Sequence, residues 1–295
     1  MAKSTLKIQW EGKQLENTPT PVYLGVTLDR TLSFRAHVEK VRIKLSPRCN
    51  VITLLANSSW GADPQTLRTT SLALCYSTAE YCAAVWCRSA HAHRVNAELI
   101  RACRTITGNL KTTPLPALYR LSGISPPEVR RETIACTERS KQLSDTMHPH
   151  QEVAKRLKSR RSFTALAGLP NITPQSYRLS KWNEIDPHTT NVALPDPSEC
   201  LPPGTELPRV QWVTLNRARA KVARTGDNMV KWGHSVNPEC PCGAEIQTME
   251  HIMSSCSLSP TCTDNDLKHQ EHDLLTILNQ HQHKSRGSDD VKLHT

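Results

Sequence analysis

The sequence predicts a mainly α-helical chain with a small β hairpin at its N-terminus and a short metal-binding module near its C-terminus. Two β-prone runs stand near the start, and apolar residues then recur at helical period as far as residue 143. A proline-rich stretch without sustained period follows, and a compact group of cysteines and one histidine comes after it. We therefore expect a helical region over residues 1–148, a disordered linker over 149–208, a basic helix with a metal module over 209–262, and a polar tail over 263–295.

The N-terminal hairpin is expected from residues 6–10 and 22–28. Both runs are rich in residues typical of strands, and the polar segment EGKQLENTPTP separates them. They are expected to form a hairpin or a pair of edge strands.

The first two helices of the region follow Asp29. The first carries one apolar face and contains Pro47, which predicts a kink or a break. The second opens with Asp63 as N-cap and Pro64 in the first turn. Because residues 67–82 are apolar nearly all round, we expect it to be the buried central helix.

Two further helices complete the predicted helical region. One is expected over His93–Thr107 and ends at Gly108-Asn109. The other opens at Pro126-Pro127 and fades near His148. In the linker that follows, a basic cluster is either a nuclear-localisation or nucleic-acid patch or an ordinary solvated charge run. Its members are Lys155, Arg156, Lys158, Arg160 and Arg161.

A helix beginning near Trp212 is predicted to carry a basic stripe. Trp212, Leu215 and Val222 share its apolar face. Arg217, Lys221 and Arg224 lie on the other side at spacing i, i+4 and i+7. The stripe is either a phosphate-binding surface for RNA or DNA or a solvated helix face.

Four potential metal ligands stand within seventeen residues. Cys240, Cys242, His251 and Cys256 follow the order C-x-C-x8-H-x4-C, with Gly243 allowing a turn after the second cysteine. Three thiolates and one imidazole suit tetrahedral Zn²⁺, and a site with four protein ligands is structural because no position remains for a substrate. Chance clustering is the alternative, since the chain has 11 cysteines and 13 histidines.

Composition narrows the class of protein. The net charge of +10 and pI near 9.2 favour polyanionic partners such as nucleic acid. The N-terminus has no signal-peptide core and the apolar runs are too short to span a membrane. We therefore expect a soluble intracellular protein with no membrane partner, for which the nucleus is a candidate location. The oligomeric state is left open.

The sequence shows no recognisable set of catalytic residues. The pair Asp289-Asp290 lies in the polar tail, and no glycine-rich phosphate loop or nucleophile elbow is present, so no small-molecule substrate is expected. Cys82 with Cys87, or His91 with His93, could form a second metal site or a nucleophile pair. Burial or chance explains them better.

Four segments resemble a known family. They are VYLGVTLDRTLSFRAHVEKV (22–41), RACRTITGNLKTTPLPALYRLSGISPPEVRR (101–131), WVTLNRARAKVARTGDNMVKWG (212–233) and CPCG with TMEHIMSSC (240–256). In this order they resemble the C-terminal part of reverse transcriptases from non-LTR retrotransposons of the jockey-like kind. The resemblance implies that the first block belongs to the polymerase thumb. It also implies that Cys240, Cys242, His251 and Cys256 form the Cys/His knuckle of that family.

The resemblance also implies what such an enzyme needs elsewhere. Its fingers, its palm with an aspartate pair for two-metal chemistry, and its endonuclease would all precede residue 1. We therefore expect a fragment that binds nucleic acid and is inactive as an RNA-directed DNA polymerase. Two alternatives remain: an active reverse transcriptase by homology, and an unrelated zinc-dependent protein-interaction module.

Overall fold

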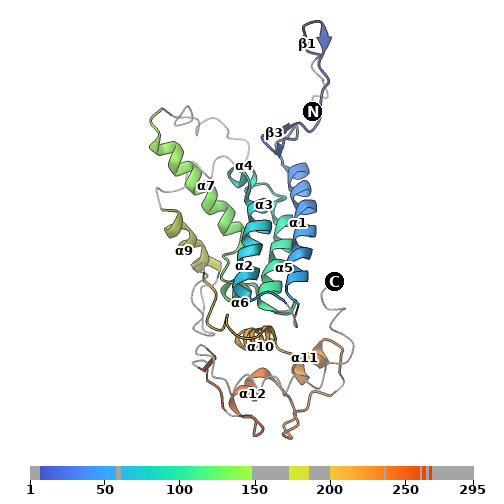
Figure 1. Cartoon of the computed structure of the whole chain (residues 1–295), viewed down its shortest axis with the longest axis vertical. Helices are drawn as coiled ribbons and strands as arrows, with labels where there is room; N and C mark the ends of the chain where they lie inside the picture. The colour runs from blue at the N-terminus through green and yellow to red at the C-terminus, as the bar shows by residue number, and fades with distance from the viewer. Residues whose placement is uncertain are drawn as a thin grey trace.

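The computed structural model describes residues 7–57, 61–147, 173–185, 200–235, 237–259, 261–263 and 266–267. Helices dominate these residues, and the strands are confined to the N-terminal part (Figure 1). The predicted fold class is therefore confirmed. Among the described residues, none of the helices is both long and apolar enough to cross a membrane.

Residues 9–27 form two separate two-stranded hairpins, where a hairpin or a pair of edge strands was expected from residues 6–28. Their strands are β1 (Gln9–Trp10), β2 (Lys13–Gln14), β3 (Val22–Tyr23) and β4 (Val26–Thr27). Each strand pairs with the next one along the chain, β1 with β2 and β3 with β4. The two runs do not pair with each other: the first pairs with Lys13–Gln14 of the polar segment, and the second folds back on itself, each through a two-residue turn. Both turns, Glu11-Gly12 and Leu24-Gly25, have positive φ, as tight hairpin turns require.

The helical region is a bundle of packed helices. Its elements are α1 (Arg35–Leu55), α2 (Pro64–Ser71), the π-helical segment η1 (Leu72–Tyr76), α3 (Ser77–Glu80), α4 (Ala83–Trp86), the 3-10 turn η2 (Ala92–Val95), α5 (Asn96–Thr107), α6 (Leu115–Ser122) and α7 (Pro127–Ser144). Figure 1 shows α1, α2, α3 and α5 side by side, with α7 at one flank. The core between them is apolar and includes Val38, Leu45, Ile52, Leu67 and Leu99, all fully buried.

Helix α1 runs through Pro47 without a break. Proline removes one backbone hydrogen bond and usually interrupts a helix. Here Leu45, Cys49 and Ile52 are buried on both sides of the proline. The packing of this face outweighs the lost bond, so the predicted break does not occur; a kink at Pro47 stays a prediction.

The central segment begins as predicted and then departs from a regular α-helix. The Asp63 carboxylate accepts the backbone N–H of Thr66 at 2.9 Å, which confirms the N-cap. At η1 the backbone N–H of Ser77 bonds to the carbonyl of Leu72, five residues earlier. Helix α3 then ends at Glu80: Tyr81 leaves the helical conformation with ψ 125°, and Cys82 has a positive φ. Burial is also partial along this segment, since Leu74 is 37% exposed.

Helix α6 was not expected from the sequence. Pro114 precedes it, and Gly123 ends it in the left-handed conformation with φ 60°. A Cβ atom at Gly123 would lie 2.1 Å from the carbonyl oxygen of Cys200. The chain around residue 200 therefore packs directly against the end of α6.

Part of the predicted linker is helical. Residues Pro174–Ile185 form α9, which packs against α7. Trp182 is buried in the core of the bundle, and the Arg120 guanidinium lies 5.2 Å from its ring. The expectation of disorder was wrong here, because the aromatic side chains of Tyr177 and Trp182 are buried and attach this helix to the bundle. The basic cluster at 155–161 lies outside the described residues.

Within the described residues from 200 onwards, three short helices are present, two of which pack on a second core. They are α10 (Arg209–Arg219), α11 (Gly226–Lys231) and α12 (Met249–Ser254). Leu215 and Ala218 of α10 pack with Met249 and Ile252 of α12. Figure 1 shows these three helices at one end of the bundle.

Candidate metal centre

The loop that carries the first two cysteines is a tight turn. The backbone N–H of Gly243 donates to the carbonyl of Cys240 at 2.9 Å, and the N–H of Cys240 donates to the carbonyl of Ala244 at 2.9 Å. Gly243 has φ 96°, which is accessible to glycine at little cost. The turn thus brings the two cysteine side chains together.

Helix α12 and its end place the other two potential ligands. The hydroxyl of Thr248 caps the helix by accepting the backbone N–H of His251 at 3.0 Å. Beyond the helix, the N–H of Cys256 donates to the carbonyl of His251 at 2.9 Å. One short capped helix therefore sets the positions of His251 and Cys256.

The four side chains converge as the motif predicts. One ligand atom from each of Cys240, Cys242, His251 and Cys256 lies within 4.8 Å of every other. The Sγ atoms of Cys240 and Cys256 are 3.8 Å apart, and the Cys242 Sγ lies 3.1 Å from the His251 Nε2. This group could hold a metal ion.

Local contacts shift the pKa values of Cys242 and Cys240 in opposite directions. The Ala244 backbone N–H donates to Cys242 and is the main cause that lowers the pKa of this thiol to about 6. Burial raises the pKa of Cys240 to about 11. A cysteine that binds a metal does so as a thiolate, and the lowered pKa of Cys242 favours that form.

Two neighbouring side chains support the group, and sequence reasoning missed both. The Nδ1 of His251 lies 3.1 Å from the Ser255 hydroxyl, which leaves Nε2 to face the sulfurs. The Gln247 amide oxygen accepts the N–H of Gly226 at 2.8 Å, and its nitrogen lies 3.9 Å from the Cys240 Sγ. The position of Ser255, four residues after His251, was the available signal.

The predicted basic stripe does not lie on one helix. Helix α10 ends at Arg219, and Lys221 has φ 53°, so Lys221 and Arg224 follow the helix instead of extending it. Lys221 is exposed, whereas Arg224 is half-buried. The Nε of Arg217 donates to the carbonyl of Gly108 at 3.1 Å. The expected helical spacing of the three residues was therefore wrong; their role remains a prediction.

Helix α10 instead supplies hydrogen bonds to the end of α5. Trp212 Nε1 donates to the carbonyl of Ile106 at 3.0 Å, and Asn216 Nδ2 donates to that of Thr107 at 3.2 Å. Arg209 donates to the carbonyls of Ile106, at 2.6 Å, and Thr105. Burial lowers the pKa of Arg209 to about 10, and Arg217 adds repulsion. The last carbonyls of a helix lack partners within it, and here side chains of α10 provide them.

The cysteine and histidine pairs considered as a second site do not form one. Within the described ranges, Cys82, Cys87, His91 and His93 do not join any group of three potential ligands. The pair Asp289-Asp290 lies outside those ranges.

Charge is distributed unevenly between the two parts. Residues 1–148 contain 20 lysines and arginines against 11 acidic residues. Residues 237–259, which hold the metal-ligand candidates, contain three glutamates and neither lysine nor arginine. The positive charge therefore belongs mainly to the helical region.

The chain is similar to a protein of known type over part of its length. It is 32% identical over 123 residues to a protein described as "Retrovirus-related Pol polyprotein from type-1 retrotransposable element R1 4" from Nasonia vitripennis. The match covers 41% of this chain and 31% of that protein, so it spans less than a third of the relative. No protein-family model matches the chain, and no solved structure matches it. The similarity supports a retrotransposon-related origin.

Proposed function

We propose that this chain is a nucleic-acid-binding part of a retrotransposon RNA-directed DNA polymerase, folded at its C-terminal end around one structural Zn²⁺. The observation that carries the proposal is the convergence of Cys240, Cys242, His251 and Cys256. The similarity to a Pol polyprotein supports the class of partner. We assign the chain itself no catalytic step.

The geometry of the cysteines favours zinc. With Zn–S bonds near 2.3 Å, two sulfurs of a tetrahedral site lie about 3.8 Å apart. The Cys240 and Cys256 sulfurs are 3.8 Å apart. Three sulfurs and one nitrogen form a closed set of ligands, so the ion would stabilise the fold of α11 and α12 and perform no chemistry.

The basic surface of the helical region supports a polyanionic partner. Arg35, Lys40, Arg42 and Lys44 are exposed along α1. We place further phosphate contacts at Arg217, Lys221 and Arg224, at and beside the end of α10. Contacts of this kind release counterions and give affinity without sequence preference.

The zinc part of the proposal is tested by metal content. Expressed with zinc and dialysed, the full chain should retain one zinc per molecule by elemental analysis. Cys242→Ser should retain none, whereas Cys200→Ser should behave as the parent because Cys200 is exposed and outside the ligand group. Loss of zinc from both variants, or none bound by the parent, would contradict it.

The nucleic-acid part is tested by the salt dependence of binding to single-stranded RNA. Replacing Lys221 and Arg224 by Gln should reduce the log–log slope by about 1.4 units, because each phosphate contact contributes about 0.7. A control with Lys141→Gln and Lys231→Gln removes the same charge at residues paired with Glu138 and Asp227. An equal loss in the control would show that only net charge matters.

One observation favours a second candidate, a zinc-dependent protein-interaction module. Around the metal-ligand group, Ile246 is 50% exposed and Leu258 is 56% exposed. Glu239, Glu245 and Glu250 are also exposed there. An apolar and acidic surface suits a protein partner better than phosphates. If the chain does not bind nucleic acid even at low salt, this second candidate is favoured.

A further inference from the structure

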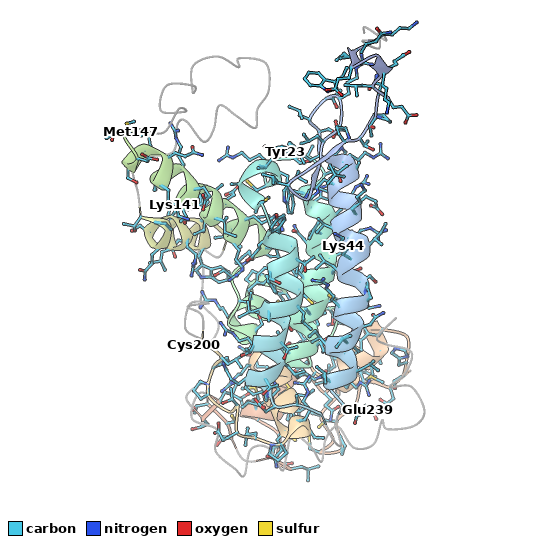
Figure 2. The ribbon with its side chains drawn as sticks, turned by 45° about the horizontal axis from the view of Figure 1, so that its top comes forward. Tyr23, Lys44, Lys141, Met147, Cys200 and Glu239 are labelled. Carbon is cyan, nitrogen blue, oxygen red and sulfur yellow. The ribbon has the colours of Figure 1, made fainter. Side chains whose placement is uncertain are left out.

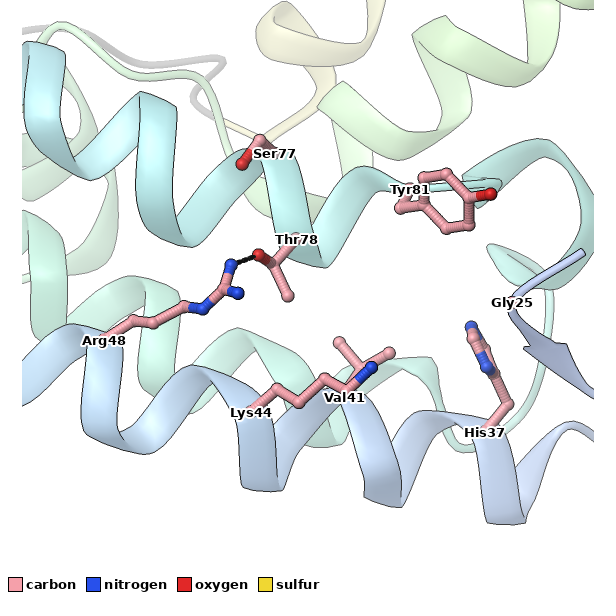
Figure 3. Close-up of a pocket in the computed structure, with 8 residues that line it drawn as sticks. All are labelled: Gly25, His37, Val41, Lys44, Arg48, Ser77, Thr78 and Tyr81. Atoms are coloured by element: carbon pink, nitrogen blue, oxygen red, sulfur yellow. Dashed lines mark hydrogen bonds between the residues drawn. The ribbon is translucent and has the colours of Figure 1, made fainter.

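A pocket of about 260 Å³ opens between α1 and the segment that follows η1. Its lining comes from Gly25, His37, Val41, Lys44, Arg48, Ser77, Thr78 and Tyr81 (Figure 3). Aspartate and glutamate are not among these residues. The pocket therefore has positive charge from two side chains and no carboxylate to neutralise it.

His37 places a buried hydrogen-bond donor in this pocket. The side chain is 4% exposed, and its Nδ1 accepts the backbone N–H of Thr27 at 3.3 Å. A neutral imidazole whose Nδ1 accepts carries its proton on Nε2. Nε2 is buried and has no hydrogen-bond partner. Burial lowers the pKa of His37, and Lys44 and then Lys40 lower it further, which keeps the ring neutral.

The cations stand along the same side of the pocket. Figure 3 shows the Lys44 side chain running along α1 towards His37, with Arg48 further along the helix. The acidic residues nearest in sequence are already paired, Glu39 with Arg42 and Glu80 with Arg130. Lys44, which Figure 2 labels on α1, is exposed, so a ligand can reach it from solvent.

The π-helical segment fixes the opposite wall. Arg48 donates to the carbonyl of Leu74 at 3.0 Å and to the Thr78 hydroxyl. The Tyr81 hydroxyl donates to the carbonyl of Leu24 at 3.1 Å, which holds the β3–β4 turn over one end. A Cβ at Gly25 would lie 3.1 Å from the Tyr81 ring, so the turn approaches closely. The pocket is thus built by contacts from three separate segments.

We propose that this pocket binds a phosphate group, with Lys44 and Arg48 supplying charge and His37 Nε2–H donating to a phosphate oxygen. A phosphate oxyanion is the ligand that an uncompensated lysine, an arginine and a neutral N–H donor recognise together. The group is either a phosphodiester of a bound strand or free inorganic phosphate. The first source rests on the proposed function, whereas the pocket itself does not.

The test follows the His37 ring by ¹⁵N NMR of the full chain during titration with inorganic phosphate and, separately, with a short RNA lacking terminal phosphates. The His37 signal is assigned from its loss in His37→Asn, since asparagine can still accept from Thr27. We expect phosphate to shift the Nε2 resonance to saturation. Lys44→Gln should weaken binding about tenfold, because a charge-assisted hydrogen bond is lost. Lys40→Gln, the same change at an exposed lysine outside the pocket lining, should have little effect.

The outcomes separate this site from the proposed function. A shift with both ligands would show that the pocket binds the phosphodiester of a strand. A shift with phosphate alone would support the pocket and show that the RNA does not occupy it. If neither ligand shifts the His37 signal, the inference is overturned, because the Nε2–H group then binds no phosphate. Equal weakening by Lys40→Gln and Lys44→Gln would also overturn it, because charge in general and not the pocket would be responsible.

Discussion

The Nε atom of Arg217 donates a hydrogen bond to the carbonyl oxygen of Gly108, 3.1 Å away. Gly108 ends α5 in the left-handed conformation, and Val213 of α10 packs over it. Together with Trp212 and Asn216, this bond caps the terminal carbonyls of α5. The part of the chain that carries the metal-ligand candidates is therefore attached to the bundle through α10.

Substitution at Gly108 tests this attachment. A Cβ atom there would lie 2.2 Å from the Val213 Cγ2, and φ is +71°. Gly108→Ala should lower the free energy of unfolding by about 2–4 kcal/mol, because backbone strain and a steric clash add. Gly12→Ala is the control: it has φ +76° with open space around it, so it should cost only about 1 kcal/mol. Equal costs in urea unfolding would show that α10 does not pack on this residue.

Helix α9 should contribute to the stability of the bundle. Trp182→Ala removes a buried indole from the core and should cost about 3–5 kcal/mol in urea unfolding. Leu179→Ala, on the same helix but 44% exposed, should cost less than about 1 kcal/mol. A Trp182→Ala variant as stable as the parent would mean that α9 is not docked.

Ser255 should tune the metal centre without binding the ion. Ser255→Ala removes the hydroxyl beside His251 Nδ1 and should weaken zinc affinity about tenfold, as other changes around a ligand do. Ser254→Ala is the matched control, since that hydroxyl donates to the carbonyl of Glu250 instead. Competition with a chromophoric chelator measures both. Identical affinities would remove Ser255 from the site.

Asp29 should make stability depend on acid pH. Burial opposes ionisation of this carboxyl, but hydrogen bonds from Ser33 and Thr31 outweigh it and lower its pKa from 3.8 to about 2. The folded pKa lies below the unfolded value, so the stabilisation is present above pH 3.8 and is lost as pH falls towards 2. Asp29→Ala should cost about 1 kcal/mol at pH 7, a modest value because solvent screens the carboxyl. Urea unfolding at pH 7 and pH 2.5 should show the difference shrinking; a constant difference would exclude this role.

Local signals in the sequence were sufficient for helix ends and for the metal-ligand group. Asp63-Pro64, Gly108 and Pro126-Pro127 act within one turn of their own residues, so their effects could be predicted from the sequence. The four ligand candidates lie within seventeen residues and depend only on one turn and one capped helix. Features that depend only on residues close in sequence can be predicted without knowledge of tertiary contacts.

Features that depend on distant residues could not be predicted. The role of Arg217 depends on a carbonyl 109 residues earlier in the chain. The phosphate pocket combines His37 with Thr78 and with a turn at Gly25, and Trp182 orders a segment whose composition indicated disorder. In each case tertiary packing outweighed local propensity.

The central claim, that the chain binds nucleic acid, is tested most directly by the binding of single-stranded RNA to the zinc-loaded full chain across a range of salt concentrations. Fluorescence anisotropy should give a binding constant that falls linearly with salt on a log–log plot, with a slope of about −2 or steeper, equivalent to three or more phosphates. Absence of binding at low salt, or affinity independent of salt, would contradict the account.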